Sequence, residues 1–145
     1  MQNPIRYGVY HDLNEIYLTL NSHYFNSRVD ATVTWGRHRS HRNSKKYSIR
    51  LGSYDMESGS ITIHPVLDQA SVPRLCVERI VYHEMLHQTC PARRVSRDRL
   101  RIHTAEFRAA ERLFIGAELA DSWFKSNLEK ILHFAPLTFK SESRI

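Results

Sequence analysis

The chain has 145 residues, of which 41% are hydrophobic and 25% charged, and its formal net charge is +6 at neutral pH. This composition is typical of one globular domain with a hydrophobic core, and it excludes an intrinsically disordered chain. The sequence contains no run of about 18 apolar residues and no secretory signal at its start, so neither a membrane span nor export is expected. We therefore expect one monomeric, cytoplasmic domain over residues 1–145, with its core at about 12–134.

The first half of the chain predicts one helix followed by three short strands. Asp12 and Glu15 have the spacing of a helix-capping box, and apolar residues then recur at helical intervals to about residue 27. Alternating segments rich in β-branched residues predict strands at residues 31–35, 47–51 and 60–64. The polar segment that begins at Gly52 is expected to form a turn, and His64 is expected to be a capping or surface residue. Three successive strands favour a small three-stranded antiparallel sheet with one face against the helices.

The second half predicts three helices. The first is apolar on nearly every face, as is typical of a buried helix, and it stops at Pro91. An arginine-rich loop leads to the second, which runs from His103 to a C-terminal stop at Gly116. The last begins near Leu119 and ends before Pro136. The chain is therefore expected to belong to the α+β class, with an N-terminal helix, a central helix and two C-terminal helices.

The central helix carries the sequence His-Glu-x-x-His. Positions four apart lie on one face of a helix, so His83 and His87 can direct ring nitrogens at one metal ion. Glu84 lies about 100° further round the helix, where a general base must stand to take a proton from a water molecule on the metal. A buried glutamate without a partner is rare and costly, and a metal ion supplies the reason for it. The motif therefore predicts a metal site with Glu84 as its catalytic residue.

A catalytic zinc ion takes three protein ligands and leaves one position open for water. The candidates for the third ligand are His103, Glu106 and Glu111, all of which follow the motif. His103 comes sixteen positions after His87, which is enough for a loop that returns across the metal helix. Glu106 is its main competitor, and the residues alone leave the choice open.

The two cysteines, Cys76 and Cys90, lie near opposite ends of the central helix. At the helical rise they are ~21 Å apart, beyond the reach of a disulfide. Reduced thiols agree with a cytoplasmic protein. No Cys-x-x-Cys pair occurs in the sequence, so no zinc ribbon or finger is expected. Cys90 is expected to be a helix-end residue and not a ligand.

Positive charge is concentrated in two segments. Residues 37–50 include six Lys or Arg and no acidic residue, and residues 93–101 include five Arg and one Asp. Two such clusters in a small basic chain indicate a polyanionic partner. DNA is the candidate, bound through the basic loops 37–50 and 93–101, and a solvated loop is the alternative for each cluster.

In these features the chain resembles the SprT-like metalloprotease family, whose eukaryotic members include Spartan. The resemblance covers residues 13–114. Its most specific parts are residues 80–87, with the metal motif, and His103 followed by Glu106 and Phe107. Weaker matches are Leu20, Tyr24, Phe25 and Asn26 in the first helix, Val33, Thr34 and Trp35 in the first strand, and Ile61, Thr62 and Ile63 in the last.

The resemblance implies a zincin-like domain in which His83, His87 and His103 bind one catalytic zinc ion, with Glu84 as the catalytic residue. It implies a zinc-dependent endopeptidase that acts on protein or peptide substrates, including proteins associated with DNA, and an association with DNA in the cell. Thr104 stands where members of the family often have Gly, and the family's C-terminal zinc ribbon does not occur in the sequence.

Two other functions fit the same residues. A metal-dependent hydrolase of phosphoesters or nucleotides would use this type of site beside basic loops. A nucleic-acid-binding module with a structural zinc would need a fourth protein ligand, such as Cys90.

Overall fold

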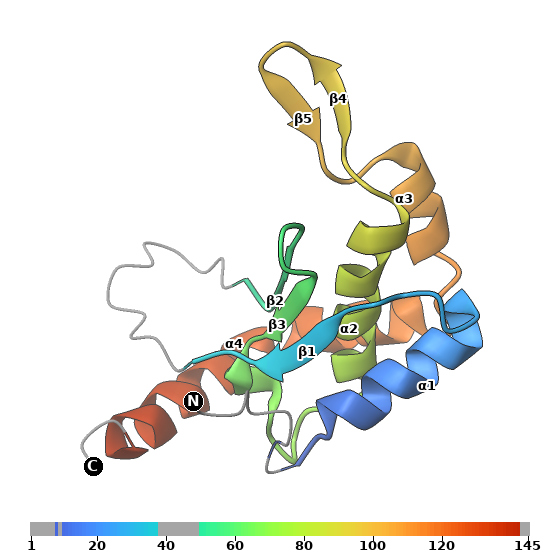
Figure 1. Cartoon of the computed structure of the whole chain (residues 1–145). Coiled ribbons are helices and arrows are strands. Elements are labelled where there is room, and N and C mark those ends of the chain that lie inside the picture. The colour runs from blue at the N-terminus through green and yellow to red at the C-terminus, as the bar shows by residue number, and fades with distance from the viewer. Residues whose placement is uncertain (1–7, 9, 38–49, 143–145) are drawn as a thin grey trace.

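A computed structural model of the chain describes residue 8, residues 10–37 and residues 50–142, with side chains described as far as residue 132. These residues form an α+β domain with four α-helices and a small mixed sheet, as Figure 1 shows. The elements follow in the order α1 (Leu13–Phe25), β1 (Thr32–Trp35), β2 (Gly52–Asp55), β3 (Ser60–Ile63), η1 (Pro65–Leu67), α2 (Arg74–Thr89), β4 (Arg93–Ser96), β5 (Arg99–Arg101), α3 (Ala105–Glu111) and α4 (Ala117–Glu142). Within the described part of the chain, no helix combines the length and apolar character that crossing a bilayer requires.

The central helix, α2, packs against α1, α3, α4 and two strands of the sheet. Pro73, with its fixed φ, stands at its N-cap position, and Cys90 is its C-cap, directly before Pro91. Its buried side chains are Cys76, Val77, Val81, Tyr82, Glu84, Met85 and Leu86. The predicted buried helix is therefore confirmed, and both cysteines are free and buried, as expected.

The N-terminal helix, α1, begins as the capping pattern predicts. The side chain of Asp12 accepts hydrogen bonds from the backbone N–H groups of Asn14 and Glu15. The carboxylate of Glu15 does not complete the capping box; it pairs instead with Arg74 at the start of α2, at 2.9 Å. This ion pair joins the first turns of α1 and α2.

The three-stranded sheet is mixed, so the expectation of an antiparallel sheet is wrong for one pair of strands. The strand order is β1-β3-β2. β2 and β3 are antiparallel, whereas β1 and β3 are parallel, with Thr32 opposite Ser60 and Trp35 opposite Ile63. Alternating hydropathy marks a strand but not its direction. Here β2 belongs to the connection that brings the chain back to the start of β3, and such a crossover makes a parallel pair possible.

The second strand also differs from the prediction. β2 lies at Gly52–Asp55, where a turn was expected, and residues 47–49 of the predicted strand lie outside the described residues. Its polar sequence has little intrinsic strand preference. Pairing with β3 and packing against α2 hold it in place, and such tertiary contacts outweigh local propensity.

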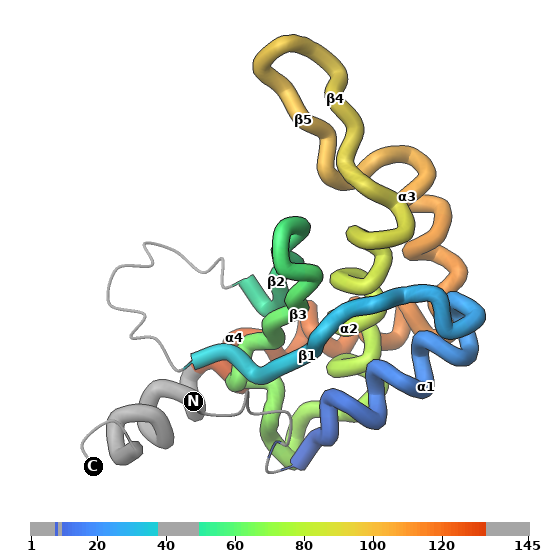
Figure 2. Tube along the Cα trace, viewed as in Figure 1, coloured from blue at the N-terminus to red at the C-terminus, as the bar shows by residue number. Residues whose placement is uncertain are grey.

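The arginine-rich segment after α2 is a β-hairpin rather than a loop. β4 and β5 are antiparallel and are joined by Arg97 and Asp98, with an irregularity in register between Arg94 and Ser96. Every residue of both strands is exposed. Figures 1 and 2 show the hairpin extending away from the rest of the domain. A run of charges suggested a loop because the hydropathy pattern of a strand requires a buried face, which this hairpin does not have.

The two C-terminal helices have different bounds from those expected. α3 is shorter than predicted: it begins at Ala105, after the N-cap Thr104, and ends at Glu111. Gly116, at φ 90°, lies between α3 and α4 in the left-handed region that glycine tolerates best. α4 continues beyond Pro136. A proline removes one helical hydrogen bond and can bend a helix without ending it.

Candidate metal centre

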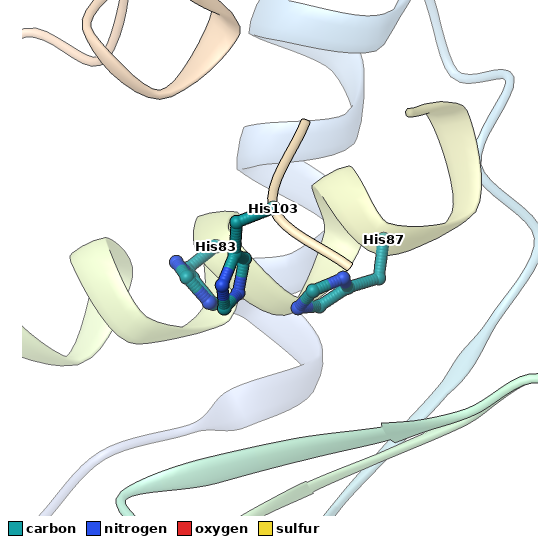
Figure 3. A group of neighbouring side chains, drawn as sticks. All are labelled: His83, His87 and His103. Atoms are coloured by element: carbon teal, nitrogen blue, oxygen red, sulfur yellow. The ribbon is translucent and has the colours of Figure 1, made fainter. Parts of the chain in front are cut away.

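Three histidines from two segments of the chain converge at one point. His83 and His87 lie one turn apart on α2, and His103 lies between β5 and the N-cap of α3. Their candidate ligand nitrogens are all within 4.8 Å of one another, and each pair of rings has a centroid separation of 5.1 Å. Figure 3 shows the three rings gathered at one point beside α2. The histidines therefore lie close enough to hold a single metal ion.

The chemistry of these donors suits a metal. Burial, the largest cause, lowers the pKa of His83, and it lowers the pKa of His87 to about 4 together with the neighbouring imidazoles. Both rings are therefore neutral at physiological pH, which leaves a nitrogen lone pair free to coordinate. Three imidazoles match the ligand set of catalytic zinc and also suit copper, iron and nickel.

The ring of Phe107 packs against all three imidazole rings. Its side chain is fully buried, and its ring centroid lies 5.0 Å from that of His83, 4.7 Å from that of His87 and 4.9 Å from that of His103. The hydroxyl of Thr104 accepts a hydrogen bond from the backbone N–H of Phe107 at 3.1 Å, which caps α3 directly after His103. The cap and the buried ring together determine where His103 stands.

Glu84 lies beside the histidines in a protected position. Glu84 is only 5% exposed, and its Oε2 lies 3.9 Å from Nε2 of His87. Burial raises the pKa of Glu84 to about 7, and the charge of Arg50 opposes this rise. On its other side the carboxylate lies against the backbone of Gly52 at the start of β2. A carboxyl group with a pKa near neutrality can both accept and release a proton at physiological pH.

A cleft of about 410 Å³ opens over these groups. Its lining comes from α2, from the start of β2, from the segment after β5 and from α4. The lining residues are Arg50, Leu51, Gly52, Arg79, Ile80, His83, Glu84, His87, Ile102, His103 and Asp121. The three histidines and Glu84 therefore share one solvent-accessible cleft.

The other candidate ligands are not among the converging donors of the described residues. Glu106 is exposed on α3, and Glu111 contacts Nδ1 of His83. Cys90 caps the C-terminus of α2 and, within the described residues, is not one of the converging donors. His64 caps η1 through Nδ1, which accepts from the backbone N–H of Val66 at 3.0 Å, in agreement with its predicted capping role.

Four residues of the site were not singled out as such from the sequence: Gly52, Arg50, Arg79 and Glu111 in its contact with His83. Arg79 precedes His83 by four positions in the predicted central helix, so helical spacing could have placed it on the same face as that histidine. Nothing in the sequence near Arg50 or Gly52 indicates that these residues line the cleft. The segment that begins at Gly52 was expected to be a turn, and only its pairing as β2 brings it beside α2.

Comparison of the chain with family models, with curated proteins and with solved structures gave no match.

Proposed function

We propose that the protein is a zinc-dependent endopeptidase of the SprT-like type, with a zincin-like active site. The observation that carries the proposal is the convergence of His83, His87 and His103 in one cleft with the buried carboxylate of Glu84. Three imidazoles and an adjacent general base are the parts that metal-assisted hydrolysis of an amide requires.

In this proposal the three histidines hold the metal ion. When bound, such an ion lowers the pKa of a water molecule toward neutrality and polarises a peptide carbonyl. Glu84 accepts the proton of the attacking water and delivers it to the leaving amine nitrogen. In the protein without a metal ion, burial raises the pKa of this carboxyl group to about 7, and burial therefore favours acceptance of the proton. Phe107 excludes water from the side of the rings that faces the core.

A substrate peptide has a place to bind beside the cleft. The strand order β1-β3-β2 leaves β2 at the edge of the sheet, and Leu51 and Gly52 line the cleft directly. An extended peptide can add to an edge strand through main-chain hydrogen bonds, which give affinity with little dependence on sequence. We infer that the scissile bond is presented to Glu84 in this way.

DNA is the proposed partner that brings protein substrates to the cleft. Within the described residues the support comes from the hairpin formed by β4 and β5, whose five exposed arginines include Arg93 opposite Arg101. Like charges directly opposite each other destabilise a pair of strands, and a polyanion would relieve their repulsion. A two-stranded ribbon also fits the major groove of DNA. Of the other basic segment only Arg37 and Arg50 lie in the described part.

A metal-dependent phosphoester hydrolase is the second candidate. The observation in its favour is Arg50, which lines the cleft and could neutralise a phosphate. Arg79 also lines the cleft, but its guanidinium already pairs with two carboxylates.

One experiment separates these functions. The purified protein is analysed for bound metal and then incubated with casein, with a DNA-binding protein in the presence and absence of DNA, and with nucleotides and RNA. We expect cleavage of protein, and we expect Glu84→Gln to keep the metal and abolish this cleavage. Glu106→Gln, which changes an exposed carboxyl group in the same way, is the matched control. Full proteolysis by Glu84→Gln would refute its role as base, and hydrolysis of phosphoesters alone would favour the second candidate. A metal that resists exchange and has a fourth protein ligand would favour a structural zinc.

A further inference from the structure

Two rows of side chains face each other across the candidate metal centre. Arg79, His83 and His87 follow one another at intervals of four on α2, and Phe107 and Glu111 have the same interval on α3. Because residues four apart share one face of a helix, each row presents its members in line. Phe107 meets the imidazole rings, while Glu111 meets both Arg79 and His83.

Nδ1 of His83 is in hydrogen-bonding contact with Oε1 of Glu111. A carboxylate can only accept a hydrogen bond, so Nδ1 must carry the proton and donate it. The neutral ring then keeps its lone pair on Nε2, the one nitrogen of His83 that remains available to the cleft. Glu111 therefore selects the tautomer of His83 and also restrains the rotation of its ring.

The second oxygen of the same carboxylate faces Arg79. Nη2 of Arg79 lies 3.7 Å from Oε2 of Glu111, and Nε lies 3.2 Å from Oδ1 of Asp121 on α4. The side chain of Arg79 is only 12% exposed, and its guanidinium lies over the ring of Phe114 at 5.9 Å. Arg79 thus lies within ion-pair distance of one oxygen of Glu111, and the other oxygen contacts His83.

The placement of Arg79 differs from that of an ordinary surface ion pair. Its Nη1 is buried and has no hydrogen-bond partner within the described part of the chain. Arg79 is therefore a mostly buried arginine whose guanidinium lies between two carboxylates, those of Glu111 and Asp121. Arg74, which pairs with Glu15 and Glu78, is by contrast 43% exposed, as is usual for ion pairs on a protein surface.

From these contacts we propose that Glu111 is a positioning residue for His83 and that Arg79, anchored by Asp121, positions Glu111. The inference rests on the metal site of the proposed function, but it does not require that the protein cleave peptides. Partners that orient a ligand histidine typically change metal affinity by about 10- to 100-fold when they are removed. The relay also links α4, through Asp121, to the orientation of a residue in the cleft.

Metal affinity is the first readout. The apparent Kd for zinc is measured by competition with a chelator for the wild type, Glu111→Ala, Glu111→Gln, Arg79→Met and the double variant Glu111→Ala/Arg79→Met. We expect Glu111→Ala to weaken binding by about 10- to 100-fold and Arg79→Met to weaken it by less. The double variant should bind no more weakly than Glu111→Ala, because Arg79 acts through Glu111. Glu106→Ala, an exposed carboxyl group on the same helix, should leave the affinity unchanged.

The tautomer of His83 is the second readout, and it is measured in the metal-free protein by nitrogen NMR of the histidine rings. The wild type should carry the proton on Nδ1 of His83, and Glu111→Ala should show a mixture of both tautomers. Glu111→Gln keeps the volume of the side chain, so it serves if Glu111→Ala fails to fold; it should still bind zinc more weakly, since the charge is gone.

The outcomes of this experiment and of the proteolysis assay are distinct. Wild-type zinc affinity in folded Glu111→Ala, or in Glu111→Gln if Glu111→Ala does not fold, would overturn the relay, whatever the protein hydrolyses; an unchanged tautomer counts against it only in Glu111→Ala, because the amide of Gln can still accept from Nδ1. Additive effects of the two substitutions would overturn the part assigned to Arg79. If the wild type binds zinc and cleaves no peptide, the proposed function fails, and the zinc affinities of the variants still decide the relay. If the wild type binds no zinc, the tautomer measurement alone decides.

Discussion

Gly52 and Glu84 lie so close together that a side chain at position 52 would press on the Glu84 side chain. A Cβ atom added to Gly52 would be 3.0 Å from both Cγ and Oε1 of Glu84 and 2.9 Å from Cγ2 of Ile80. The space that a side chain at position 52 would need is already filled by the side chains of Glu84 and Ile80. The sheet and the metal helix meet at this point, so the position of Glu84 depends on both.

The first prediction concerns this contact. Gly52→Ala should leave the fold and the zinc content intact but displace the Glu84 carboxylate, and peptide cleavage should fall by about tenfold or more, because a 1 Å misplacement of a reacting group can cost about 100-fold. The measurement is kcat/KM on a peptide substrate together with metal analysis. Ser53→Ala, a change at the adjacent position, is the control. Unchanged kcat/KM in a folded Gly52→Ala protein would mean that Glu84 need not lie where it does.

The second prediction concerns the third ligand. His103→Ala should deplete bound metal, whereas Glu106→Ala should not, because only His103 lies with the other two histidines. Metal content after purification, measured at equal protein concentration, is the readout. Retention of the metal by His103→Ala together with its loss in Glu106→Ala would move the ligand to Glu106.

The third prediction concerns Phe107, which is fully buried and contacts the three imidazole rings. Phe107→Ala should lower the free energy of unfolding by about 3–5 kcal/mol, since it removes a large side chain from a packed core. Urea unfolding of the metal-free protein measures this loss separately from metal binding. Leu113→Ala is the control, because Leu113 is 71% exposed and its truncation should change stability little. Equal effects of the two substitutions would contradict the packing described here.

The fourth prediction concerns Cys76. Burial, aided by the negative charge of Asp121, raises the pKa of its thiol from 9.0 to about 11. At pH 8 the thiolate fraction is then about a hundredfold lower than in the unfolded chain, and the thiolate is the reactive form. Labelling with a thiol reagent should therefore be slow for Cys76 in the folded protein and fast in urea. The same shift makes the folded state bind more protons between about pH 9 and pH 11, so this thiol should lower stability as the pH rises through that range. Rapid labelling of Cys76 without denaturant would contradict its burial.

The fifth prediction concerns the hairpin. Replacing Arg93 and Arg101 with Gln should weaken binding to duplex DNA and reduce the slope of log affinity against log salt by about 1.8, since each phosphate contact contributes about 0.9. The double variant Arg28→Gln/Arg112→Gln has the same net charge and changes exposed residues outside the hairpin. Equal slopes for the two double variants would mean that DNA, if bound, does not contact this hairpin.

The local features of this protein could be predicted from its residues alone. The capping position of Asp12, the buried helix α2 and the shared face of His83 and His87 all follow from the helical period, which acts over a few residues. Separation along one helix likewise explained why Cys76 and Cys90 are not joined. These predictions needed no knowledge of the rest of the chain.

Features that depend on contacts between distant residues could not be predicted in this way. The parallel pairing of β1 with β3 and the strand at Gly52 are set by pairing and packing partners that hydropathy patterns do not encode. From the residues alone, the third ligand was left open among His103, its main competitor Glu106, and Glu111. The cap at Thr104 and the buried ring of Phe107 place His103 beside the other histidines and turn Glu111 toward Nδ1 of His83. The helical period aligns residues within one helix, but only the packing of α2 against α3 brings the aligned side chains of the two helices into contact.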